Sequence, residues 1–169
     1  MSFLYHIGRY AMLIGLMLKR PEKSAMYLRQ ILVEIDKLGL QSLGIVAIIS
    51  VFMGAVVTIQ TAFNTDHPLL PVYAIGFATR QAIILEFSPT MIALILAGKV
   101  GSRIASEIGT MRVTEQIDAL EIMGVNAAGY LILPKLIAAM IINPFLVIIS
   151  MFLGIFGGWL ISAITDVMP

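Results

Sequence analysis

Residues 136–165 read LIAAMIINPFLVIISMFLGIFGGWLISAIT, a run of 30 positions without a charged side chain. About 20 predominantly apolar residues suffice for a helix to cross the hydrocarbon core of a bilayer. Trp159, near the far end of the run, suits the membrane–water interface, and Pro144 inside it predicts a kink. The stretch therefore predicts a transmembrane helix, which we extend back to residue 130.

The composition of the whole chain also indicates a membrane protein. Of its 169 residues, 59% are hydrophobic and only 12% are charged, against about 25% charged in soluble domains, and the mean hydropathy is +0.97. The net charge of +1 provides no field that would attract nucleic acid. Cysteine is absent and the two histidines stand far apart, so neither a thiolate site nor a catalytic metal site is expected.

Two more spans are expected before this one. Residues 38–65 form an uncharged run of 28 positions and predict the first span. The apolar run 87–98 has only 12 positions, so the second span must continue past two basic residues and is predicted over 87–109. Residues 66–86 are expected to form a loop with an interfacial or partly inserted helix. The predicted fold class is an all-α membrane protein with three transmembrane helices.

The distribution of lysine and arginine predicts the orientation, because cytoplasmic loops carry the excess of both. Residues 1–37 hold six of them, residues 66–86 hold one and residues 99–135 hold four, while none follows. The N-terminus and the segment after the second span are therefore expected in the cytoplasm. Two amphipathic helices with basic flanks are expected within residues 1–37, either lying in the headgroup layer or packed against the spans.

Small residues recur at every fourth position along the second predicted span. This spacing places them on one helix face, where small side chains let two helix backbones approach closely in a membrane. The partner is either another helix of this chain or, as a sharper hypothesis, a second subunit or a sliding surface in a transport cycle. The residues of this small-residue ridge are Ala97, Gly98, Gly101, Ser102, Ala105 and Gly109.

Charged residues follow another face of the same predicted helix. Lys99, Arg103 and Glu107 are spaced by four, so Arg103 and Glu107 can pair. Long basic side chains at a membrane boundary commonly extend toward the headgroups. Alternatively, these residues line a cavity that admits a charged headgroup.

Residues 107–124, EIGTMRVTEQIDALEIMG, are charged although they lie between two predicted spans. Gly109 is expected to end the preceding helix, Thr114 suits an N-cap and Gly124 suits a C-terminal stop, which predicts a short helix within 114–124. A helix this short is unstable alone in water, so its neighbours or a partner must hold it. An ordinary amphipathic loop helix and a helix that transmits motion from a soluble partner both fit this position.

Residues 96–138 resemble the signature region of the MlaE-type, or YrbE-like, permeases of ABC transporters. The matching motifs are EIGTM at 107–111, TEQIDAL at 114–120, Gly124-Val125 and Pro134. The resemblance covers essentially the whole chain and is strongest over 87–138. The sequence has no G-x-x-x-x-G-K-[ST] motif for nucleotide phosphates, so ATP hydrolysis is expected on another polypeptide.

The resemblance implies a homodimeric permease in the bacterial inner membrane, bound to two copies of a cytoplasmic ABC ATPase. ATP and Mg²⁺ would be held by that ATPase, and no cofactor is expected on this chain. An MCE-domain protein would stand on the periplasmic side, and some systems add a STAS-domain protein on the ATPase. The complex would move phospholipids or related lipids between the inner and outer membranes and so maintain outer-membrane lipid asymmetry.

The resemblance also assigns roles to residues. The segment after the second span would be the coupling helix that docks on the ATPase, and the lipid cavity would lie between the two permease copies. By their polarity within or beside the spans, Gln60, Lys99, Arg103 and Glu107 are assigned to lining or gating that cavity. The coupling role falls on Arg112, Thr114, Glu115, Gln116, Asp118, Leu120, Glu121 and Met123.

Members of this family usually carry two further spans after the one that ends near residue 165. We therefore treat the expected function as that of the complete permease, of which this sequence would be a part. A hypothesis of a different class is a membrane scaffold or assembly subunit without transport activity. A small ion channel is disfavoured, because the predicted spans have neither rings of charge nor a filter-like loop.

Overall fold

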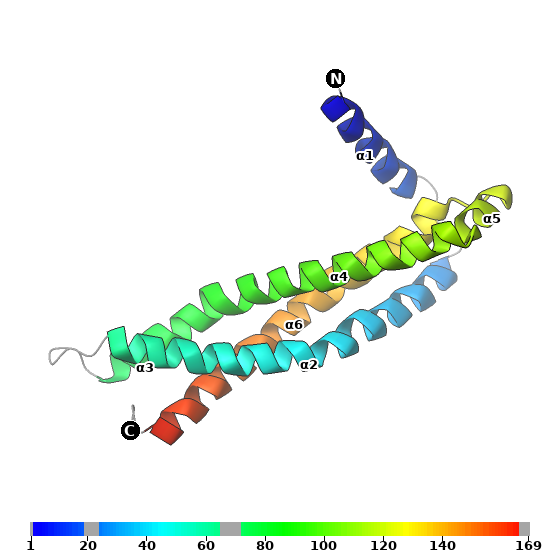
Figure 1. Cartoon of the computed structure of the whole chain (residues 1–169). Helices are drawn as coiled ribbons and strands as arrows, with labels where there is room; N and C mark the ends of the chain where they lie inside the picture. Colours follow the sequence, from blue (N-terminus) through cyan, green and yellow to red (C-terminus); the bar gives the residue numbers. More distant parts are fainter. Residues whose placement is uncertain (1, 19–23, 65–71, 166–169) are drawn as a thin grey trace. The chain divides into compact units, whose positions relative to one another are not determined.

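The computed structural model describes residues 2–18, 24–64 and 72–165, and within them the chain is almost entirely helical, without a strand (Figure 1). This finding confirms the predicted all-α class. The elements are α1 (Ser2–Leu18), α2 (Ser24–Asn64), α3 (Val72–Ala82), the π-helix η1 (Ile83–Phe87), α4 (Ser88–Val113), α5 (Gln116–Ile122) and α6 (Ala127–Thr165).

Three helical segments are long and apolar enough to cross a membrane, namely Tyr27–Asn64, Tyr73–Val113 and Ala127–Thr165. Their lengths of 38, 41 and 39 residues exceed the length that a span requires, which is about 20 residues. The described part of each predicted span falls on one of these segments. The chain is therefore a multi-pass membrane protein.

The second of these segments differs from its prediction at both ends. A helix expected within residues 66–86 is present as α3, but nothing separates it from the second span, because α3 continues through η1 into α4 without a break. Arg80 and Glu86 lie on this continuous helix with exposed side chains, so their charge does not interrupt it. Gly109 does not end the helix either, and α4 continues to Val113. A single glycine lowers helix stability by only about 1 kcal/mol, which a long helix tolerates.

The first span likewise joins the helix that precedes it. The sequence predicts an interfacial helix up to residue 37 and a separate span from residue 38, whereas α2 is continuous from Ser24 to Asn64. No proline stands within α2, so nothing in its backbone forces a break. On α1 the described side chains from Tyr5 to Ile14 are mostly exposed. Placement of α1 in the headgroup layer stays a prediction.

The helices divide into two compact units, and the division falls inside α2, α4 and α6. Unit 1 comprises Met1–Leu38 and Lys99–Ile142, and unit 2 comprises Gly39–Gly98 and Asn143–Pro169. Among the described residues of unit 2, only Arg80 and Glu86 are charged. The other charged side chains that the structure describes belong to unit 1.

Unit 2 is held together by small residues at which α2 and α6 approach closely. A Cβ atom added to Gly54 would overlap the carbonyl of Gly154, and one added to Gly157 would overlap the backbone of Val51. The hydroxyl of buried Thr58 donates a hydrogen bond of 2.7 Å to the Gly54 carbonyl, so it leaves no buried donor unsatisfied. Close backbone packing of this kind stabilises helix pairs in a membrane, where apolar burial gives little driving force.

The small-residue ridge on α4 takes no part in this packing. All six ridge residues are exposed, and a Cβ atom added to Gly98, Gly101 or Gly109 would meet nothing within 4 Å in the described parts of the chain. No described helix therefore covers the ridge. Its use as a contact with a second subunit stays a prediction.

Candidate functional site

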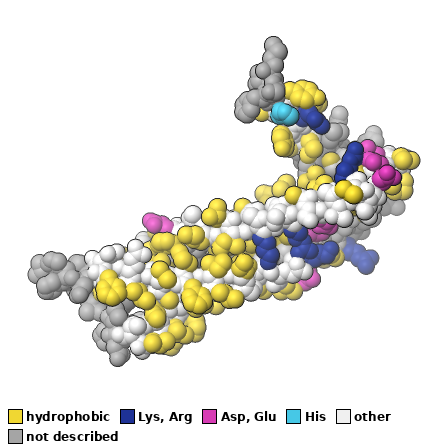
Figure 2. Space-filling view, in the orientation of Figure 1, with side chains coloured by type: hydrophobic (Ala, Val, Ile, Leu, Met, Phe, Trp, Pro, Cys, Tyr) yellow, Lys and Arg dark blue, Asp and Glu magenta, His cyan; other side chains and the backbone are white. Residues whose placement is uncertain are grey.

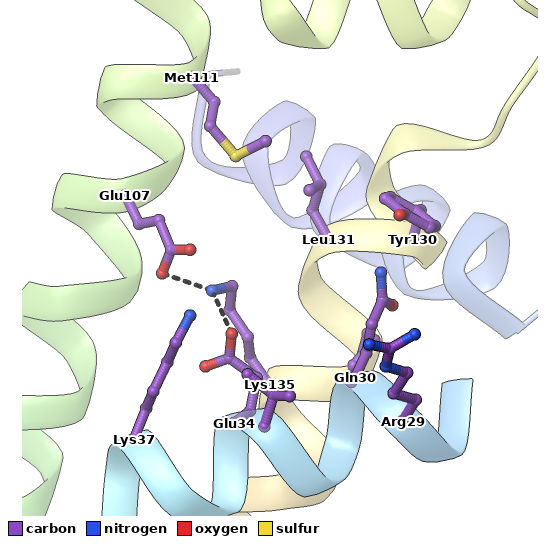
Figure 3. Close-up of a pocket in the computed structure, with 11 residues that line it drawn as sticks. Arg29, Gln30, Glu34, Lys37, Glu107, Met111, Tyr130, Leu131 and Lys135 are labelled. Atoms are coloured by element: carbon purple, nitrogen blue, oxygen red, sulfur yellow. Dashed lines mark hydrogen bonds and ion pairs between the residues drawn. The ribbon is translucent and has the colours of Figure 1, made fainter. Parts of the chain in front are cut away.

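One lysine of unit 1 is almost completely buried where three helices meet. The Lys135 side chain on α6 is only 6% exposed, and its ammonium group contacts carboxylates from two other helices (Figure 3). Its Nζ donates to Glu34 Oε1 on α2 at 3.2 Å and to Glu107 Oε2 on α4 at 2.5 Å. We call Glu34, Glu107 and Lys135 the ion triad.

The ion triad connects α2, α4 and α6 within unit 1. A buried charge requires partners, because removing an ion from water costs several kcal/mol. The two carboxylates depend on the lysine to different degrees, since the side chain of Glu34 is 12% exposed and that of Glu107 is 38% exposed. A hydrogen bond of 3.4 Å from the Tyr27 hydroxyl on α2 to the Gly129 carbonyl on α6 supports the same arrangement.

A cavity of about 400 Å³ lies beside the ion triad, and we call it the triad cavity. Gln30 Oε1 is buried and has no hydrogen-bond partner in the described parts of the chain. Arg29 and Lys37 form no ion pair with any described residue. Among the described residues, the lining of the cavity therefore includes two cations without an ion-pair partner. Besides the ion triad, its lining consists of Arg29, Gln30, Val33, Lys37, Met111, Tyr130, Leu131 and Pro134.

The triad cavity lies at the edge of the apolar part of all three helices. On α2 its residues directly precede the uncharged run 38–65, and on α6 they directly precede the uncharged run 136–165. On α4 they follow the apolar run 87–98. If these runs occupy the hydrocarbon core, the cavity lies at the depth of the lipid headgroups, on the face predicted to be cytoplasmic.

The structure brings one of the four predicted cavity residues into this site. Glu107 belongs to the ion triad, with Lys135 rather than Arg103 as its partner in an ion pair. Lys99 and Arg103 are half-buried on α4 and do not line the triad cavity. The Arg103 guanidinium donates to the Lys37 carbonyl at 3.3 Å. Gln60 lies in unit 2 with an exposed side chain.

The sequence contained a signal for the residues that were missed. Glu34 and Lys135 each stand within four residues of a long uncharged run, as Glu107 stands shortly after one. Charged residues at the same end of three spans are expected to lie at the same depth and can therefore meet. That reasoning gives the depth of each residue but not the direction in which its side chain points.

The predicted coupling segment contains the short helix α5, which begins at Gln116 and not directly after Thr114 as expected. Glu115, not Thr114, precedes α5, and it has a left-handed backbone with φ 58°. The Thr114 hydroxyl donates to the Thr110 carbonyl at 2.9 Å, so Thr114 still belongs to the end of α4. The helical turn closes at Gly124, the predicted stop. Its φ of 76° lets the N–H groups of residues 124 and 125 donate to the carbonyls of Glu121 and Leu120.

The surface of α5 is exposed and carries both charge and apolar side chains. None of its residues is buried, and charged side chains gather near it in Figure 2. The Arg112 guanidinium donates to Asp118 at 2.5 Å, which ties α5 to the end of α4. Ile122 is 87% exposed and Met123 is 69% exposed. Contiguous exposed apolar side chains beside charged ones are typical of a surface that binds another protein.

The fold and these sites define a class, a multi-pass helical membrane protein with a short exposed helix between two of its spans. The chain belongs to the MlaE permease family, because the family model described as Permease MlaE matches residues 31–169. This match confirms the resemblance found in the signature motifs.

Related proteins support the same assignment. A probable ABC transporter permease protein of Rickettsia prowazekii is 34% identical over 95% of this chain and 62% of its own length. One from Synechocystis is 38% identical over 80% of this chain and 51% of its own length. Protein TRIGALACTOSYLDIACYLGLYCEROL 1, chloroplastic, of Arabidopsis thaliana is 32% identical over 88% of this chain and 42% of its own length. The chain thus spans at most about three fifths of the length of these relatives.

Proposed function

We propose that this chain is part of the permease subunit of an ABC transporter that moves phospholipids or related lipids between the inner and outer membranes. ATP would be hydrolysed by a separate cytoplasmic ATPase that holds ATP and Mg²⁺. The family and the names of the relatives support a transporter permease. A lipid cargo is supported by the Arabidopsis relative, whose name contains that of a galactolipid.

The observation that carries the coupling part of this proposal is the position of α5. It is exposed between the ends of α4 and α6, with only two residues separating α4 from α5 and four separating α5 from α6. The Arg112–Asp118 ion pair and the backbone bonds around Gly124 limit its freedom further. A force applied to α5 by an ATPase would therefore reach both long helices. Glu121, Ile122 and Met123 would form part of the docking surface.

The remaining partners belong to the same proposal. A second copy of the permease would bind through a surface that includes the exposed small-residue ridge, because small residues favour close helix contacts in membranes. An MCE-domain protein would bind on the outer side, and in some systems a STAS-domain protein would bind the ATPase. The complex would lie in the bacterial inner membrane with the N-terminus of this chain in the cytoplasm and would maintain outer-membrane lipid asymmetry.

A charge-reversal experiment tests the coupling surface. Glu121→Lys together with Gln116→Lys changes two exposed side chains of α5 without removing the internal Arg112–Asp118 ion pair. In the full-length permease we expect normal membrane insertion but loss of co-purification with the ATPase. Glu86→Lys is the matched control, because Glu86 is also an exposed glutamate on a helix and lies in unit 2. Normal ATPase binding by the double variant would contradict the assignment.

Transport itself is tested by reconstitution. The complete complex in phospholipid vesicles is expected to hydrolyse ATP faster when transportable lipid is present, and the α5 variant should lose this stimulation. An equal rate of ATP hydrolysis with and without transportable lipid in the intact complex would favour the scaffold hypothesis.

A further inference from the structure

The boundary between the two compact units crosses each long helix beside a residue that weakens helical bonding. It falls directly before Gly39 on α2, directly after Gly98 on α4 and one residue before the Asn143–Pro144 bond on α6. Glycine and proline are the two residues least suited to the interior of a helix. We call Gly39, Gly98 and Pro144 the boundary residues.

On α6 the boundary lacks a helical hydrogen bond. Pro144 has no N–H group, so it donates nothing to the carbonyl of Met140, which is four residues earlier. Met140 belongs to unit 1 and Pro144 belongs to unit 2. The missing bond is therefore one that would have joined the two units along this helix.

On α2 a side chain from another helix bonds to the backbone at the boundary. The Arg103 guanidinium on α4 donates to the Lys37 carbonyl at 3.3 Å. In a regular helix the carbonyl of residue 37 accepts from the N–H of residue 41, and the boundary lies between these two residues. A side chain that enters the backbone ladder in this way is a common cause of helix bending.

On α4 the boundary is followed by a glycine–serine pair. The Ser102 hydroxyl donates to the Lys99 carbonyl at 3.0 Å, and such bonding of a serine to the preceding turn often accompanies a bend. A Cβ atom added to Gly98 or Gly101 would meet nothing within 4 Å in the described parts of the chain. Packing among the described helices therefore does not require glycine at either position.

Glycines inside unit 2 have a different surrounding. Gly54 and Gly157 face the backbones of Gly154 and Val51 on the opposite helix, so a bend at either would break a close backbone contact. Within unit 1, the ion triad connects the same three helices. These contacts resist bending on both sides of the boundary and leave the boundary residues as the positions where α2, α4 and α6 deform most readily.

We propose that α2, α4 and α6 bend at the boundary residues and so form a hinge that converts a displacement of α5 into a tilt of the helix parts in unit 1 relative to unit 2. This inference rests on the proposed function, in which an ATPase displaces α5. Val113, at the end of α4, lies 15 residues beyond Gly98, which is about 22 Å of helix, so a bend of about 20° would move it by about 8 Å.

The first test replaces Pro144 by alanine and by glycine in the full-length permease. Both variants regain the backbone N–H, but alanine favours the helix over glycine by about fivefold. Both should bind the ATPase. Lipid-stimulated ATP hydrolysis in vesicles should fall about fivefold in Pro144→Ala and stay near the wild-type rate in Pro144→Gly. A packing role for Pro144 predicts the opposite order, because glycine leaves the larger cavity.

The second test uses α4 and separates bending from contact through the small-residue ridge. Gly98→Ala should lower lipid stimulation because it stiffens the helix at the boundary. Gly109→Ala is matched to it, since Gly109 is also an exposed ridge glycine with open space around it but lies well inside unit 1. Any effect on the ridge is common to both variants, so an equal loss in the two would overturn the hinge at Gly98.

Amide hydrogen exchange measures the bending directly, in the full-length permease without ATPase. Peptides covering residues 96–102 and 141–148 should exchange faster than the peptide covering 150–158, which contains the close contacts of α6 with α2. Exchange within 141–148 should be about fivefold slower in Pro144→Ala than in Pro144→Gly. If a variant fails to fold, the wild-type comparison still decides. Equal exchange in the three wild-type peptides would overturn the hinge, as would lower lipid stimulation in Pro144→Gly than in Pro144→Ala.

The two kinds of measurement separate this inference from the proposed function. Fast exchange at the boundary residues, in a permease whose complete complex shows no stimulation of ATP hydrolysis by lipid, supports the bending and refutes the transport function. Lipid-stimulated hydrolysis that is equal in Pro144→Ala and Pro144→Gly supports transport and refutes the hinge.

Discussion

Replacement of Lys135 by methionine is the perturbation to which unit 1 should be most sensitive. Methionine fills a similar volume but removes the partner that the Glu34 carboxylate has among the described residues, and the Glu34 side chain is only 12% exposed. Leaving one member of a buried ion pair uncompensated destabilises proteins by about 3–5 kcal/mol. Glu107 is 38% exposed and can regain water, so most of the loss should come from Glu34. We therefore expect Lys135→Met to lower the free energy of unfolding by about 3 kcal/mol.

Two further variants make this reasoning refutable. Glu107→Gln should lower stability by about 1 kcal/mol or less, because partly exposed ion pairs contribute little. Glu34→Leu combined with Lys135→Met should recover most of the loss, since apolar residues often replace a buried ion pair at little cost. Denaturant unfolding of the full-length protein in detergent gives all three values. Equal losses for Lys135→Met and Glu107→Gln, or a double variant no more stable than Lys135→Met, would show that burial of Glu34 is not the cause.

Two other predictions concern the backbone. Gly157→Ala should prevent α2 and α6 from packing, because its Cβ atom would overlap the backbone of Val51; accumulation in membranes and thermal stability should both fall. Gly44→Ala, at a glycine of α2 with open space around it, is the control and should gain up to about 1 kcal/mol of helix stability, and equal behaviour of the two variants would refute the packing argument. Glu115→Gly should stabilise the turn before α5 by about 1 kcal/mol, because φ 58° is strained for a residue with a Cβ atom; an unfolding midpoint below that of the wild type would contradict this.

The fold could be predicted where long uncharged runs decide it and not where local signals compete with helix continuity. The runs 38–65 and 136–165 gave the positions of two spans because no other environment suits so many apolar residues. The boundaries were less accurate. Gly109 was expected to end the second span, and residues 66–86 to include a loop before it, but the helix is continuous from Val72 to Val113.

The candidate site could be predicted only in part, for a geometric reason. Glu107 was recognised from its spacing along one helix, which is a local property. Its partner Lys135 is 28 residues away and Glu34 lies 101 residues from Lys135, so their meeting depends on the rotation of three helices about their axes. Periodicity within one helix does not contain that information. The end of α5 was predicted correctly, because Gly124 determines it through its own backbone conformation.

The ion triad and α5 are parts of one closed segment of chain. The Glu107–Lys135 ion pair joins α4 to α6 on either side of α5 and so closes the segment from residue 107 to residue 135, which contains the whole coupling segment. Within this segment, Arg112 and Asp118 form a second ion pair, which is more exposed. A displacement of α5 therefore cannot pull α4 away from α6 without separating a buried ammonium from its carboxylate. Under the proposed function, the motion that an ATPase imposes on α5 would move the end of α4 and the start of α6 together. The shape of the triad cavity would then change because these two helix ends shift relative to α2.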